Sequence, residues 1–105
     1  MEKIKILVVD DESRMRKLVK DFLGREGYQV LEAGDGLEAM EAFYAEKDIA
    51  LIILDVMMPN MDGWQTCREI RQSSKVPIIM LTHAAMSGMN FRDLILAWTN
   101  TFLSI

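Results

Sequence analysis

The sequence predicts an α/β fold built on a doubly wound parallel sheet. Short apolar runs alternate along the chain with segments of helical periodicity, at a spacing that suits right-handed βαβ units. The apolar runs lie at residues 4–9, 28–33, 49–54 and 76–81. The first run is almost continuously apolar, as expected of a strand buried on both faces. The chain therefore predicts four parallel strands with helices between them.

Each connecting segment carries helix signals. Ser13 is expected to cap the first helix, and Gly27 is expected to stop it. A second helix should follow the turn at residues 34–36, and a third should follow a loop at residues 59–63. The apolar positions expected on the helices are Met15, Leu18, Val19, Phe22 and Leu23 on the first, Leu37, Met40, Phe43 and Tyr44 on the second, and Trp64, Cys67 and Ile70 on one face of the third.

The composition is ordinary for one globular domain, with 105 residues, 50% hydrophobic and 27% charged. A net charge of −4, without a cluster of Lys and Arg, argues against direct binding of nucleic acid. Cys67 is the only cysteine, which excludes an internal disulfide and favours a reducing compartment. The N-terminus resembles neither a signal peptide nor a membrane span. We therefore expect a cytoplasmic protein without a membrane partner.

Acidic residues stand where the predicted strands end. The first run leads into Asp10 and Asp11, the third into Asp55, and the fourth into Thr82. The carboxyl ends of parallel strands share one edge of the sheet, so the three carboxylates should converge and repel one another unless a cation lies among them. Magnesium suits such a set of oxygen ligands. Any single Asp here could equally be a helix cap or a solvated acid, but three on one edge favour a metal site.

Three segments together resemble the receiver domain of bacterial response regulators. They are VVDDE at residues 8–12, LDVMMPNMDG at 54–63 and PIIMLT at 77–82, in the family's order and spacing. The resemblance covers residues 1–82, the expected receiver core, and implies a flavodoxin-like fold of the receiver type. It further implies a phosphoacceptor that assists its own phosphorylation and dephosphorylation, and not an enzyme in the ordinary sense.

The resemblance also implies a role for each site residue. Asp55 corresponds to the phosphoacceptor, which a sensor histidine kinase would phosphorylate, and Thr82 to the switch hydroxyl that bonds the phosphoryl oxygen. The implied ligands of Mg²⁺ are Asp10, Asp11, Asp55 and the backbone carbonyl of Met57.

After Thr82 the chain departs from the family pattern. The family continues with a fourth helix, a fifth strand with an aromatic residue, a Lys-Pro pair and a last helix, whereas no lysine follows Lys75 here. Possible codons for residues 83–105, when translated one base out of frame, can encode a sequence that resembles the missing part of a receiver domain. We therefore infer a one-base frameshift near the Thr82 codon. We expect residues 83–105 to form an atypical helical tail. Without the fifth strand and last helix, the fourth strand becomes an edge, which predicts a homodimer through that strand or the tail.

Two functional interpretations remain open at this point. The first is an active phosphoacceptor, and the second is an inactive or truncated receiver that serves only as an interaction or structural module. A phosphatase with an aspartyl nucleophile is excluded because Met57, and not an acid, stands two residues after Asp55. A flavodoxin is disfavoured because the loop after the first strand is acidic, whereas an FMN phosphate requires hydroxyls and backbone amides.

Overall fold

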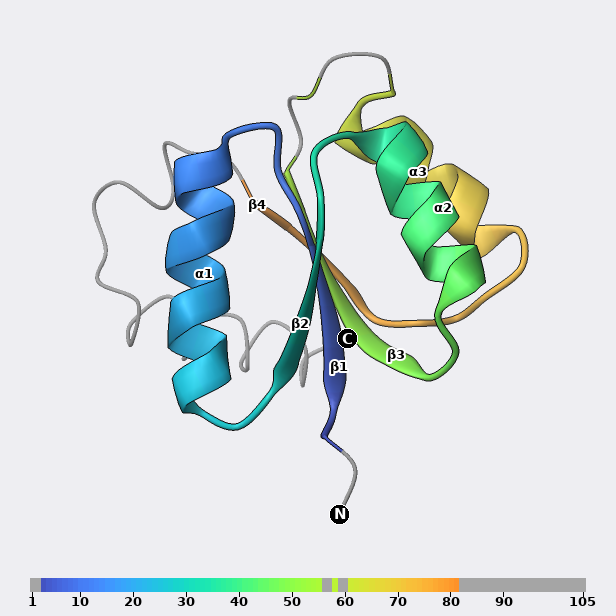
Figure 1. Ribbon diagram of the computed structural model, residues 1–105. Coiled ribbons are helices and arrows are strands. Elements are labelled where there is room, and N and C mark those ends of the chain that lie inside the picture. Colours follow the sequence, from blue (N-terminus) through green and yellow to red (C-terminus); the bar gives the residue numbers. More distant parts are fainter. Residues whose placement is uncertain (1–2, 56–57, 59–60, 82–105) are drawn as a thin grey trace.

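The computed structural model describes residues 3–55, 58 and 61–81. These residues form a parallel sheet of four strands, with α1 on one face and α2 and α3 on the other (Figure 1). This arrangement confirms the predicted doubly wound α/β fold. The predictions for Met57, Thr82 and residues 83–105 lie outside the described residues. The elements are β1 (Lys5–Val9), α1 (Ser13–Arg25), β2 (Gln29–Ala33), α2 (Gly36–Ala45), β3 (Ile49–Asp55), α3 (Gly63–Arg71) and β4 (Ile78–Leu81).

The strand order β2-β1-β3-β4 creates a point where the direction of winding reverses. The chain moves from β1 to β2 on one side, and then crosses back over β1 to add β3 and β4 on the other. The carboxyl ends of β1 and β3 therefore lie at the topological switch point, where ligands bind in open α/β sheets. In the register of these two strands, Val9 is paired with Leu54. The residues that follow each of them, Asp10 and Asp55, consequently emerge side by side.

Two apolar layers hold the helices against the sheet. Alternate residues of β1 point to opposite faces, so Ile6 and Val8 join a cluster with Val19 and Leu23 of α1. Leu7 lies in the other cluster, with residues of α2 and α3 such as Ala39 and Ile70. Because both faces of the central strands are covered, the first apolar run has no polar alternation.

The start of α1 differs from the prediction. Ser13 was predicted as the N-cap, but Glu12 occupies that position without a side-chain cap bond, and Ser13 is the first helical residue. The cause is the turn just before it, where Oδ1 of Asp10 accepts a hydrogen bond from the backbone N–H of Glu12 at 2.8 Å. This bond turns the chain into the helix one residue early. The prediction of Ser13 as N-cap is therefore wrong.

The end of α1 confirms Gly27 as the stop. Gly27 has φ 94°, a left-handed conformation that costs a glycine little. Its N–H donates to the carbonyl of Gly24 at 3.1 Å, and the N–H of Tyr28 donates to the carbonyl of Leu23 at 3.1 Å. These two bonds form a Schellman motif, which satisfies the last carbonyls of the helix and directs the chain into β2.

The predicted common face of α3 is only partly present. Ile70 is fully buried and Cys67 is half-buried, whereas Trp64 is 56% exposed. Residues three apart in a helix drift by about 60° per step, so the first and last of these three are about 120° apart. Trp64 therefore lies at the exposed edge of this face, and Leu18 and Leu37 are likewise about half exposed.

Helices α2 and α3 are in close contact at their N-termini. A Cβ built on Gly36 would meet Oγ1 of Thr66 and would lie 2.6 Å from the carbonyl oxygen of Met61. Thr66 is fully buried, and its hydroxyl donates to the carbonyl of Asp62 at 2.8 Å. Gly36 therefore allows α2 to pack against the segment that follows β3.

Candidate functional site

Three acidic side chains converge at the carboxyl edge of the sheet. One carboxylate oxygen of Asp10, one of Asp11 and one of Asp55 lie within 4.8 Å of one another. Asp10 and Asp55 are buried, at 6% and 5% exposure, whereas Asp11 is exposed. The structure thus brings together three carboxylates that come from two separate segments of the sequence.

The sheet itself positions the two buried carboxylates. Asp55 is the last residue of β3, which lies between β1 and β4, and Asp10 follows the last residue of β1. The backbone N–H of Asp10 donates to the carbonyl of Ala33 at the end of β2, at 3.1 Å. Burying carboxylates side by side is unfavourable unless positive charge or hydrogen bonds compensate them. A cation at this edge would supply that compensation.

The donor set fits Mg²⁺. Carboxylate oxygens are the hard ligands that this ion prefers, and opposite ligands of an octahedral Mg²⁺ lie roughly 4.2 Å apart. The observed limit of 4.8 Å exceeds this by less than 1 Å, which small side-chain rotations can close. Because Asp11 is exposed, the remaining positions of a bound ion would be open to water. Met57 and Thr82, the other two predicted site residues, lie outside the described residues.

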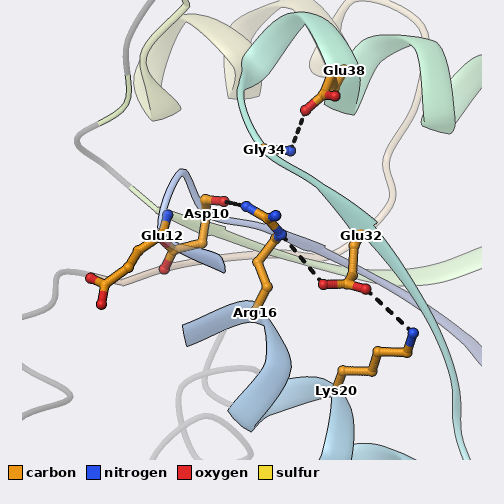
Figure 2. Close-up of polar contacts among 7 residues, drawn as sticks. All are labelled: Asp10, Glu12, Arg16, Lys20, Glu32, Gly34 and Glu38. Carbon is orange, nitrogen blue, oxygen red and sulfur yellow. Dashed lines mark hydrogen bonds and ion pairs between the residues drawn. The ribbon is translucent and has the colours of Figure 1, made fainter. Parts of the chain in front are cut away.

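Sequence reasoning missed one residue beside the carboxylates. Arg16, in the first turns of α1, donates from Nη1 to the backbone carbonyl of Asp10 at 2.6 Å and from Nε to Glu32 at 3.4 Å (Figure 2). The only sequence signal was a basic residue one helical turn after Glu12. That signal is weak, because basic residues are frequent on exposed helix faces, and the contact with Asp10 depends on the tertiary fold.

The comparison with known protein families decides the identity of this domain. The sequence profile of the response regulator receiver domain matches residues 6–103. The chain belongs to the response regulator receiver domain family. This receiver domain is therefore part of two-component signalling, in which receivers interact with sensor histidine kinases, and the family is not an enzyme class. The profile match continues past Thr82, where the resemblance of motifs ends.

Relatives of this receiver domain include regulators of transcription. It is 49% identical over 92 residues to the probable transcriptional regulator ycf27 of Porphyridium aerugineum, covering 88% of this chain and 37% of that protein. The chain spans about a third of the length of the curated relatives it matches.

Solved receiver structures share the fold. The response regulator TrrA of Thermotoga maritima, in complex with Mg²⁺-BeF, is 42% identical with a TM-score of 0.71, over 75% of this chain and 69% of that one. A receiver domain from Clostridium thermocellum is 28% identical with a TM-score of 0.80, over 96% of this chain and 95% of that one. Within the described part of this receiver domain, none of the helices has the length and apolar character needed to cross a membrane.

Proposed function

We propose that Asp55 is the phosphoacceptor of this receiver domain and that Mg²⁺ assists its phosphorylation. The observation that carries the proposal is the convergence of Asp55 with Asp10 and Asp11 at the switch point of the sheet. In this proposal the three carboxylates and the backbone carbonyl of Met57 are the protein ligands of the ion. The Mg²⁺-BeF complex of the similar receiver TrrA supports the assignment.

The reaction is a phosphoryl transfer to a carboxylate. One oxygen of Asp55 forms a bond to phosphorus while the P–N bond of the donor phosphohistidine breaks. The electron pair of that bond remains on the imidazole, and the product on the receiver is an acyl phosphate. Bound Mg²⁺ would neutralise negative charge on the phosphoryl oxygens and orient the phosphoryl group for in-line attack. In the same proposal the Thr82 hydroxyl donates to a phosphoryl oxygen and acts as the switch.

The chain's own part in this chemistry is to hold Asp55 in place. Leu54, the neighbour of Asp55, is fully buried, and β3 is hydrogen-bonded on both sides. The nucleophile therefore stands on a rigid element, which lowers the entropic cost of reaching the attack geometry. In this sense the domain assists its own phosphorylation and dephosphorylation and acts on no separate substrate.

The setting we propose is cytoplasmic, with a sensor histidine kinase as the phosphoryl donor. The single free thiol, Cys67, is consistent with a reducing compartment. The net charge of −4 supports a receiver that does not itself bind nucleic acid. We also propose self-association through β4 or residues 83–105, because among the described strands β4 is paired only with β3.

Intact-mass measurement after incubation with acetyl phosphate tests the proposal. The wild-type chain should gain one phosphoryl group when MgCl₂ is present and none when EDTA replaces it. Asp55→Asn keeps the size of the side chain and removes the nucleophile, so this variant should gain none. If folded wild-type protein shows no adduct, the proposal fails and the chain is better explained as an interaction or structural module.

A further inference from the structure

Arg16 joins three elements beside the carboxylate cluster. It lies on α1, and its Nη1 donates to the backbone carbonyl of Asp10 at 2.6 Å, at the end of β1. Its Nε lies 3.4 Å from Oε1 of Glu32 on β2, and the other oxygen of Glu32 lies 3.3 Å from Nζ of Lys20 (Figure 2). Only 20% of the Arg16 side chain is exposed, compared with 52% for Lys20. The guanidinium is thus held between the strand ends and the helix.

The carbonyl that Arg16 holds belongs to the peptide plane between Asp10 and Asp11. That plane is rigid, so fixing its oxygen also fixes the direction in which the chain enters Asp11. The rest of Asp10 is held as well, by its N–H bond to Ala33 at 3.1 Å and by the bond from Glu12 to its Oδ1 at 2.8 Å. Asp11, by contrast, is exposed. The position of its carboxylate therefore depends on the backbone that Arg16 anchors.

We propose that Arg16 is a positioning residue for the metal site, clamped in turn by Glu32. It holds the β1–α1 turn so that the carboxylate of Asp11 meets those of Asp10 and Asp55, without itself touching the ion or the phosphoryl group. This inference rests on the proposed function and adds to it a role for a residue outside the ligand set.

The geometry requires arginine and not simply a positive charge. The planar guanidinium directs one donor to a backbone carbonyl and another to a carboxylate, whereas a lysine ammonium is a point donor on a flexible stem. If charge alone matters, Arg16→Lys should keep the wild-type affinity for Mg²⁺. If the clamp matters, Arg16→Lys should weaken that affinity about tenfold, the lower end of the effect usual for residues that orient metal ligands.

Two further variants isolate the clamp. Glu32→Gln leaves Arg16 in place but removes the carboxylate that fixes its orientation, so it should weaken Mg²⁺ binding in the same direction and to a smaller extent. Lys20→Gln removes only the exposed partner of Glu32, and exposed ion pairs contribute little. This matched control should bind Mg²⁺ as the wild type does. Glu32→Gln also preserves the test if Arg16→Lys does not fold.

Calorimetric titration of the full chain with MgCl₂, at constant ionic strength, measures these affinities. Melting of the metal-free proteins gives an independent readout of stability. Weaker binding in Arg16→Lys and Glu32→Gln, at wild-type melting temperature, is the expected result. Wild-type affinity in both variants, or a lowered melting temperature with unchanged affinity, overturns the role of Arg16. A wild-type chain that binds no Mg²⁺ would instead overturn the proposed metal site itself.

Discussion

Alanine at Gly36 should destabilise the domain, because the contact between α2 and the start of α3 leaves no room for a methyl group. The added Cβ would meet Oγ1 of Thr66 and would lie 2.6 Å from both the Cβ and the carbonyl oxygen of Met61. Neither neighbour can move easily. Thr66 is fully buried with its hydroxyl bonded to Asp62, and the Met61 oxygen is part of the backbone.

The size of the effect follows from these distances. Ordinary contact begins near 3.4 Å, so the Met61 backbone must move by about 0.8 Å, or α2 must move away from α3. Overpacking of this kind costs about 1–3 kcal/mol, and the better helix propensity of alanine offsets up to about 1 kcal/mol. A net decrease of about 1–2 kcal/mol in the free energy of unfolding lowers the melting temperature by roughly 5–15 °C in a domain of this size.

Gly24→Ala is the matched control, since a Cβ there meets no atom within 4 Å. Gly24 lies within α1, so alanine should raise the stability by about 0.5–1 kcal/mol. Thermal melting followed by circular dichroism measures both variants against the wild type. A Gly36→Ala protein as stable as the wild type would refute the close packing of α2 against residues 61–66.

Two further predictions concern the core and the sheet edge. Leu54→Ala empties a fully buried site beside Asp55 and should cost about 2–5 kcal/mol in urea denaturation, whereas Leu18→Ala, at a half-exposed position, should change stability by about 0.5 kcal/mol or less. Equal losses in the two leucine variants would contradict the assigned burial. Self-association through β4 or residues 83–105 should give a dimer or larger species in size-exclusion chromatography with light scattering, and a monomer at high concentration would disprove it.

Most of the fold was predictable because a strand that is buried on both faces is recognised in the sequence as an almost continuous apolar run. Each predicted strand overlaps an observed one, with shifts of one or two residues at the ends. The boundary at Ser13 failed because a local turn of the side chain of Asp10 precedes the helix. Oδ1 of Asp10 accepts from the backbone N–H of Glu12, and the helix starts one residue early. Both Asp10 and Ser13 have side chains that can bond to a nearby backbone N–H, and the sequence does not show which of the two will do so.

The convergence of the carboxylates was also predictable, since parallel strands bring their carboxyl ends to one edge. The register of Val9 with Leu54, which places Asp10 beside Asp55, could not be predicted from separate segments. Arg16 was missed for a similar reason. Its partners, Asp10 and Glu32, lie 6 and 16 residues away in the chain, and only the packing of α1 across the ends of β1 and β2 brings them within reach.

Locating the phosphoryl group on the chain tests the central claim most directly. Protein treated with acetyl phosphate and MgCl₂ is reduced with borohydride, which converts an aspartyl phosphate to homoserine, and is then digested and mapped by mass spectrometry. The account predicts homoserine at position 55 alone, and none when Mg²⁺ is withheld. Homoserine at another aspartate, or modification at Asp55 that does not depend on Mg²⁺, would contradict the assigned site.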